Sequence, residues 1–211
     1  MTSAYDEIYL ENARKNLGHM MDYAVNSCGL KAGDFFDMFL VCGIADEFSR
    51  GNPTYVVGMS GCELVKLIVS RAGKKMNWPK EEMYLDRSPE YWSGWALAYY
   101  QWLRTKSFKR IVKAVPMEEI IGMYGTLHEA DISKFVTIID EKLKAFYVET
   151  NLKRIRQYAG YSQSQLAKEA DVGLRQIQLL EQRQRDINKA QAASVLRLAR
   201  ALGCDMEELL E

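Results

Sequence analysis

Helix-forming patterns run through almost all of this 211-residue sequence, and no other feature constrains its fold as strongly. Apolar residues recur at helical spacing in nearly every segment, and short polar residues often precede these runs where an N-terminal cap belongs. In the first third of the chain only Thr54–Val57 resembles a strand, and because it is short and has no obvious partner we expect an extended loop there. The sequence therefore predicts an all-α protein.

The region before residue 147 is expected to form a domain of several helices. One helix runs from Ser60 to Gly73, because Ser60 and Glu63 have the spacing of a capping box. Another begins at Ser88, a cap residue followed by a proline, and continues to Thr105. The other helices are expected at 5–27, 33–48, 107–115, from 117 onward and at 132–146, and the longest irregular segment at 73–87.

The composition changes near Tyr147. All four prolines precede residue 117, and the sequence after Tyr147 is rich in Gln, Arg, Leu and Ala. We therefore predict a domain boundary at about Val148, with a helical partner-binding or regulatory domain over 1–147 and a second domain over 148–211. The junction contains no glycine or proline, which favours abutting helices over a flexible tether.

The region from Asn151 onward predicts five short helices. Ser162 and Gln165 have the spacing of a capping box at the start of the second helix, and the sequence at 171–173 forms a tight turn before the third. Asn188 is expected to cap the fourth helix. The second and third helices are short, a small residue (Ala167) lies where they cross, and an apolar residue lies inside the turn, so together they predict a helix-turn-helix.

This region resembles the Cro/C1-type (Xre) family of helix-turn-helix domains. The resemblance rests on four motifs: YSQSQLA at 161–167, DVG at 171–173, RQIQLLE at 175–181 and VLRLARALGCDMEELL at 195–210. It implies a five-helix, lambda repressor-like fold and a transcriptional regulator, most simply a repressor, that binds a double-stranded DNA operator without a cofactor.

The resemblance also implies which residues contact DNA. Gln163 is similar to the family's phosphate- or base-contacting glutamine at a helix N-terminus. Arg175 is the candidate for a bidentate contact to guanine, and Gln178 for adenine or phosphate. Leu174 and Leu179 either contact thymine methyl groups or are buried against a partner. The complete predicted set is Gln163, Ser164, Leu174, Arg175, Gln176, Gln178, Leu179, Arg183 and Arg185.

Four further positions bear on the comparison with the family. Arg156 and Glu181 match the family's internal ion pair, which would fix the first helix against the third. Asp171 and Arg183, in contrast, stand where the family has turn glycines. Because arginine adopts a left-handed backbone poorly, we expect the turn after the third helix to be longer or differently shaped, although Arg183 and Arg185 keep it basic.

The charge distribution sets a limit on DNA affinity. Lys+Arg and Asp+Glu number 28 each, so the formal net charge of the chain is +0. Residues 151–188 contain 7 basic and 4 acidic residues, a net charge of +3. This allows a few phosphate contacts per domain, so we expect useful affinity to require a homodimer on two half-sites about 34 Å apart.

The helix expected to begin at Ser88 is unusually aromatic. Such density is typical of binding hot spots, but the one-face spacing of Tyr91, Trp95 and Trp102 is also what core packing requires. We favour core packing over an exposed stripe that binds a partner. Both can hold, because aromatic residues surround most of the helix, so that one side can be buried while the other binds a partner. The candidate partner-binding residues are Tyr91, Trp92, Trp95, Tyr99 and Trp102.

The stretch from Leu17 to Ile68, with DYAVNSCGLKAGDFFDMFLVCGIADEF at 22–48, resembles small helical bacterial proteins often encoded beside ADP-ribosyltransferase-like toxins. This resemblance implies an antitoxin, whose first domain neutralises a toxin while the second represses the toxin-antitoxin operon. The alternatives are a ligand-sensing repressor whose aromatic cluster lines an apolar pocket, and a protein-interaction module that has lost DNA binding.

The sequence gives little support for an enzyme, a metal-binding protein, a secreted protein or a membrane-spanning protein. There is no phosphate-binding glycine loop, nucleophile motif or metal-ligand spacing, so we expect neither an enzyme nor a metal site. The first twenty residues lack a secretory signal pattern, and no stretch of roughly 18 apolar residues follows, so we expect a cytoplasmic protein without a membrane span. The four cysteines and two histidines are scattered: Cys28, Cys42, Cys62, Cys204, His19 and His128.

Overall fold

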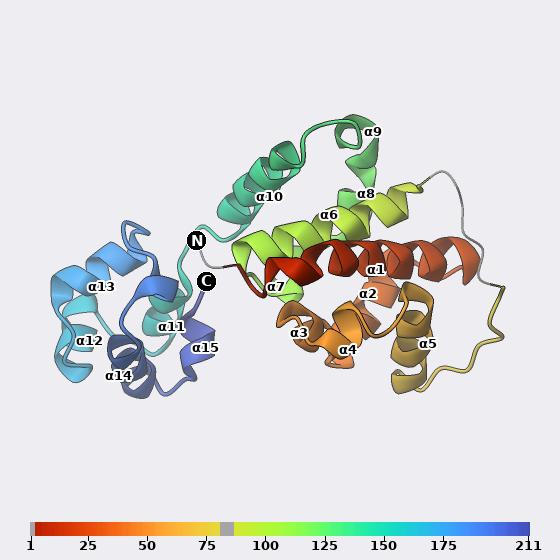
Figure 1. The fold of residues 1–211 in the computed structure, drawn as a ribbon. Coiled ribbons are helices and arrows are strands. Elements are labelled where there is room, and N and C mark those ends of the chain that lie inside the picture. Colours follow the sequence, from red (N-terminus) through yellow and green to blue (C-terminus); the bar gives the residue numbers. More distant parts are fainter. Residues whose placement is uncertain (1–2, 81–86) are drawn as a thin grey trace. The chain divides into compact units, whose positions relative to one another are not determined.

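The computed structural model describes residues 3–80 and 87–211. The chain divides into two compact units, Met1–Phe146 and Tyr147–Glu211 (Figure 1). Within the described residues every regular element is a helix, so the predicted all-α class is confirmed. None of these helices is long and apolar enough to cross a membrane.

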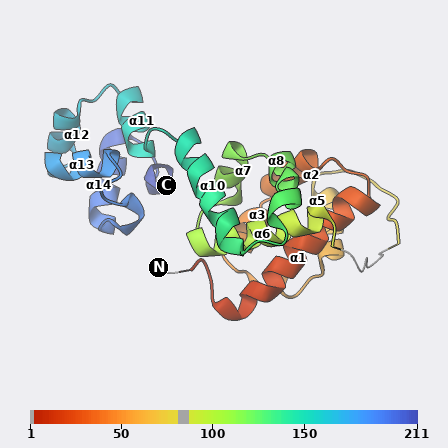
Figure 2. The ribbon, with the colours of Figure 1, turned by 90° about the horizontal axis from the view of Figure 1, so that it is seen from above.

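The first unit is built on two long helices, α1 and α6, which lie side by side (Figures 1 and 2). The single-turn η1 precedes α1, and the π-helical η2 continues it. The elements of the unit are η1 (Glu7–Tyr9), α1 (Leu10–Asp22), η2 (Tyr23–Ser27), α2 (Ala32–Val41), α3 (Ile44–Ser49), α4 (Pro53–Val56), α5 (Gly61–Arg71), α6 (Pro89–Arg104), α7 (Phe108–Ala114), α8 (Met117–Gly122), α9 (Tyr124–Leu127) and α10 (Ile132–Phe146).

Glycines allow the backbones of α1 and α6 to approach closely. A Cβ atom added at Gly94 of α6 would collide with the carbonyl oxygen of Leu17, and one added at Gly18 would lie 2.9 Å from the carbonyl oxygen of Tyr91. Elsewhere in the first unit, α2, α3 and α7 contribute a cluster of buried phenylalanine rings that meet mostly edge to face. The cluster consists of Phe36, Phe39, Phe48 and Phe108.

Two expectations for this unit were wrong. The single helix expected at 33–48 is interrupted, because Gly43 adopts a left-handed backbone (φ 79°) between α2 and α3. The extended loop expected at Thr54–Val57 is mostly the short helix α4, which Pro53 begins and which the Asn52 side chain caps by accepting a hydrogen bond from the Thr54 amide.

The capping signals were the more reliable guide. The capping box of Ser60 and Glu63 is confirmed, and the Ser88 side chain caps α6 by accepting a hydrogen bond from the Tyr91 amide. The described parts of the irregular segment expected at 73–87 contain no helix, and residues 81–86 lie outside the described residues.

The aromatic helix α6 is buried over most of its circumference. Tyr91 and Trp92 are only 5% and 7% exposed, which leaves little of either side chain for a partner to contact. Trp95 and Tyr99 are partly exposed, and the Arg14 guanidinium lies 3.4 Å from the centroid of the Trp95 ring. Trp102 is also partly exposed and donates a hydrogen bond from Nε1 to a backbone carbonyl near the start of the chain. Core packing therefore accounts for half of the aromatic side chains of α6, namely Tyr91, Trp92 and Tyr100.

The second unit is a small bundle around one apolar core. Its elements are α11 (Asn151–Tyr158), α12 (Gln163–Glu169), α13 (Leu174–Glu181), η3 (Ile187–Lys189), α14 (Ala192–Leu202) and α15 (Met206–Leu209). The core includes Leu152, Leu166, Val172, Ile177, Leu180, Ile187, Val195, Leu198 and Leu209.

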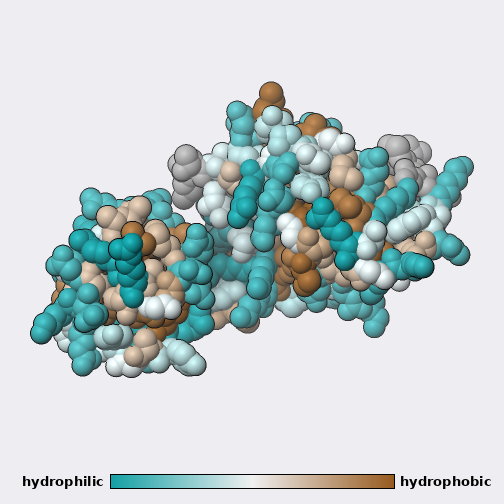
Figure 3. All heavy atoms as spheres, turned by 90° about the horizontal axis from the view of Figure 1, so that it is seen from below, coloured by the Kyte–Doolittle hydropathy of each residue, from teal (hydrophilic) through white to brown (hydrophobic). Residues whose placement is uncertain are grey.

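One cap expected in this unit was wrong. Asn188 does not cap the fourth helix, because it lies in η3 and α14 begins only after Gln191. Asp205 and Glu208 form a capping box at the start of α15. On the face drawn in Figure 3, hydrophobic residues appear as patches between hydrophilic residues on both units.

Candidate nucleic-acid interface

Helices α12 and α13 and the turn between them form a helix-turn-helix. The Ser162 side chain accepts a hydrogen bond from the Gln165 amide, and the Gln165 side chain accepts one from the Ser162 amide, so the capping box that begins α12 is confirmed. Asp171 adopts a left-handed backbone (φ 48°) in the turn, and Val172 is buried beneath it. These local features fix where α13 begins.

Helix α13 presents to solvent a face that carries polar residues and two leucines. Ile177 and Leu180 are buried in the core, whereas Leu174 is 40% exposed and Arg175 is exposed beside it. Gln176, Gln178 and Leu179 are partly exposed. The face of α13 that carries the predicted base contacts is therefore accessible.

The N-terminus of α13 has no side-chain cap. Gly173 occupies the cap position and has no side chain to accept hydrogen bonds from the first turn. Unpaired amide groups at a helix N-terminus bind anions such as phosphate oxygens well. This end of α13 can therefore contact the DNA backbone while the Arg175 side chain reaches a base.

A buried ion pair fixes α13 against α11. Arg156 donates from Nε to Glu181 Oε1 (2.6 Å) and from Nη2 to Oε2 (2.9 Å), and both residues are 8% exposed. Arg156 also donates from Nη1 to the carbonyl oxygen of Tyr161 (2.7 Å). The hydrogen bonds that Arg156 donates to Glu181 raise the pKa of the guanidinium, so it stays protonated. The pair has the geometry that the resemblance implies.

Gln163 is connected to the same carboxylate. Its Nε2 donates a hydrogen bond to Glu181 Oε2 (2.8 Å), which links the first turn of α12 to the last turn of α13. An amide nitrogen carries two protons, so Gln163 can donate one to Glu181 and the other to a phosphate oxygen. Ser164 is exposed next to it. The assignment of both residues to the DNA-binding set stays a prediction.

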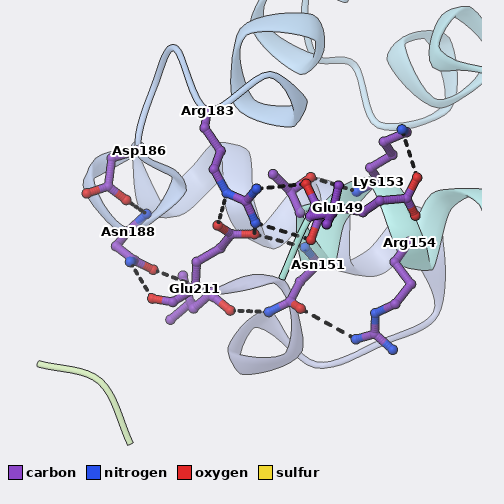
Figure 4. A network of polar contacts seen from close by, with 11 residues as sticks. Glu149, Asn151, Lys153, Arg154, Arg183, Asp186, Asn188 and Glu211 are labelled. Carbon is purple, nitrogen blue, oxygen red and sulfur yellow. Dashed lines mark hydrogen bonds and ion pairs between the residues drawn. The ribbon is translucent and has the colours of Figure 1, made fainter. Parts of the chain in front are cut away.

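Arg183 is placed differently from the expectation. Its guanidinium donates to Glu211 Oε2 (2.9 Å) and to the carbonyl oxygens of Val148 (2.9 Å) and Glu149 (3.2 Å), all within the second unit (Figure 4). Its backbone is left-handed (φ 55°), so it adopts the conformation that glycine favours. A phosphate would have to share the guanidinium with these partners, and the assignment of Arg183 to the DNA-binding set stays a prediction. Arg185 is exposed in the same turn.

Sequence reasoning missed the partners of these turn residues. Glu211 and Asn151 were not singled out, although both lie in the network around Arg183. Arg197 of α14, also missed, lies 3.5 Å from the carboxylate of Asp171 in the turn before α13. The one signal in the sequence was Arg183 itself, an arginine at a position where the family has glycine. This signal indicated an unusual role for Arg183 but did not identify Glu211 as its partner.

The arrangement of α11 to α15 is that of a helix-turn-helix DNA-binding domain, with α13 as the recognition helix. Residues 152–209 match a protein-family model described as Helix-turn-helix. The second unit is therefore a helix-turn-helix domain of the Cro/C1 type, and it supports a DNA-binding regulator. No curated protein and no solved structure matches the chain.

Proposed function

We propose that the protein is a sequence-specific transcriptional repressor, without a catalytic role, that binds an operator through α13. One observation carries this proposal: Arg175 is exposed in the first turn of a recognition helix whose N-terminus has no side-chain cap. That position suits a bidentate contact between its guanidinium and a guanine in the major groove.

The operator-binding form is proposed to be a homodimer. Of the basic residues in 151–188, Arg156 and Arg183 bind carboxylates inside the unit, and the Lys153 amine lies 2.8 Å from a Glu149 oxygen. Fewer cations therefore remain for phosphates than the charge count suggests. A single unit would bind weakly, whereas two units on adjacent half-sites add their contacts.

The test compares Arg175→Ala with Arg200→Ala. Arg200 is exposed in the last turn of α14, so its substitution removes the same charge outside the recognition helix. Binding to a fluorescent duplex with the sequence upstream of the protein's own gene is measured by anisotropy at fixed salt. We expect Arg175→Ala to weaken binding by about 1 to 3 kcal/mol, and Arg200→Ala to have a smaller effect. Equal binding of wild type and Arg175→Ala contradicts the proposal.

For the first unit we propose binding of a protein partner, specifically a toxin encoded by a neighbouring gene. The partly exposed Trp95, Tyr99 and Trp102 support a protein contact. The burial of Tyr91 and Trp92 among neighbouring helices gives less support to a ligand pocket lined by the whole cluster. Co-expression with the neighbouring gene product is expected to give a stable complex with the wild type that is weakened by Trp95→Ala. Co-expression that yields no complex contradicts the antitoxin role.

A further inference from the structure

The network around Arg183 joins segments that are far apart in the sequence (Figure 4). Glu211 accepts hydrogen bonds from the Arg183 guanidinium and, through Oε1, from the backbone amide of Asn151 (3.0 Å). The Asn188 side chain donates to the carbonyl oxygen of Glu211 (2.7 Å) and accepts from its amide (3.0 Å). The turn after α13, the element η3, the start of α11 and Glu211 are thereby held together.

The contacts of Arg183 hold its backbone in a strained, left-handed conformation. A left-handed conformation is strained for a residue with a Cβ atom, and such strain persists only where the surroundings enforce it. The Arg183 side chain supplies that enforcement, because its planar guanidinium bonds to one carboxylate and two backbone carbonyls at once. A glycine would adopt the same backbone without strain but would make none of these bonds.

The bonds of Arg183 also fix the first residues of the second unit. Val148 and Glu149 precede α11, and their carbonyl oxygens accept from Arg183. The turn that bears Arg183 directly follows the recognition helix and carries the exposed Arg185. The position of this turn is thus tied to the residues that precede α11.

We propose that Arg183 is a positioning residue for DNA binding: it holds the turn after α13 against residues 148–149 and Glu211, and it does not contact phosphate. The part of this inference that concerns DNA rests on the proposed function. The network itself is a property of the second unit and can be tested without DNA.

The first test separates a positioning role from a phosphate contact through the salt dependence of binding to the same upstream duplex. Removal of one phosphate contact lowers the slope of log affinity against log salt by about 1. We expect Arg183→Ala to weaken binding several-fold with an unchanged slope. A slope that falls by about 1 overturns the proposal.

Two more variants sharpen this test. Arg183→Lys keeps the positive charge but not the planar fork, so we expect it to bind as weakly as Arg183→Ala, whereas a phosphate contact would survive the change. Glu211→Gln removes a negative charge, which favours binding to DNA if Arg183 contacts phosphate. A positioning role predicts instead that Glu211→Gln binds DNA more weakly than the wild type. It also predicts that the double variant Arg183→Ala/Glu211→Gln binds DNA no more weakly than Arg183→Ala alone. Tighter binding by Glu211→Gln overturns the proposal.

The second test uses the full chain without DNA, so it remains valid if no operator is bound. Hydrogen exchange at the Asn151 amide, which donates to Glu211, is expected to accelerate in both Arg183→Ala and Glu211→Gln. Arg185→Ala is the matched control, because it removes an exposed arginine from the same turn, and its exchange is expected to equal that of the wild type. Unchanged exchange in Arg183→Ala and Glu211→Gln overturns the network. Failure of Arg175→Ala to weaken DNA binding would instead contradict only the proposed function.

Discussion

Helices α6 and α13 carry the most distinctive side chains of their units, yet the two units use them differently. In α6 the aromatic residues surround the helix and half of them (Tyr91, Trp92 and Tyr100) are buried, so packing explains the identity of these three. In α13 Ile177 and Leu180 are buried, whereas Arg175 and the other accessible residues, which include two leucines, have no packing role that would explain them. Side chains that packing does not require are the better evidence of function, which is why α13 supports a specific proposal more strongly than α6 does.

The largest expected effect concerns the packing role of the first unit. Phe39 is fully buried in the phenylalanine cluster, so Phe39→Ala is expected to lower the free energy of unfolding of this unit by about 3 to 5 kcal/mol. This change in the free energy of unfolding is measured by urea denaturation, which is monitored through hydrogen exchange of α2 and α7 peptides. Val41→Ala, at a side chain that is 89% exposed, is the control with an expected change within about 0.5 kcal/mol. Similar losses in both variants would contradict the assigned core.

The second prediction concerns the ion pair that supports α13. Glu181→Ala leaves the Arg156 guanidinium buried without its carboxylate and removes the acceptor of Gln163. We expect the second unit to lose about 3 kcal/mol of stability, measured by exchange of α11 and α13 peptides in urea, while the first unit is unchanged. Exchange that stays at the wild-type level in α11 and α13 would show that the pair does not fix these helices.

A smaller effect is expected at the N-terminus of α12. Ser162→Ala removes the acceptor for the Gln165 amide and is expected to cost about 1 kcal/mol in the stability of the second unit. Ser162→Asp keeps a good capping oxygen and is expected to retain most of that stability. If both variants lose the same amount, the cap is not the source of the effect.

The smallest effect concerns pH and the first unit. Burial lowers the pKa of His19, whose ring meets that of Tyr91 edge to face; Asp22 partly opposes this shift, and Arg87 and Lys15 add to it. The unfolded chain therefore binds a proton more readily than the folded one, and stability is lost as pH falls through the ordinary histidine pKa of about 6.5. Comparing the pH dependence of unfolding for wild type and His19→Gln isolates this contribution. A wild-type curve no steeper than that of His19→Gln near this pH would contradict it.

Local signals in the sequence predicted the features that depend on neighbouring residues. The cap serines Ser60, Ser88 and Ser162 were identified because a cap and the backbone amide that donates to it lie within three residues. The break at Gly43 was missed, because a single glycine inside an apolar run does not by itself show whether the backbone turns left-handed.

Contacts between distant residues could be predicted only where a family resemblance supplied them. The resemblance implied the pairing of Arg156 with Glu181, and the structure shows its geometry. Nothing comparable pointed from Arg183 to Glu211, which is 28 residues away and follows no spacing rule. Such a contact depends on how α15 returns to the start of α11, which is a property of the folded unit.

The uneven distribution of aromatic residues also makes the two units separately observable by optical spectroscopy. All four tryptophans (Trp78, Trp92, Trp95 and Trp102) lie in the first unit, and none lies after residue 102. Intrinsic tryptophan emission therefore reports on the first unit alone, including its partly exposed indoles at Trp95 and Trp102. A shift in this emission when DNA is added to the second unit would be a label-free signal of communication between the two.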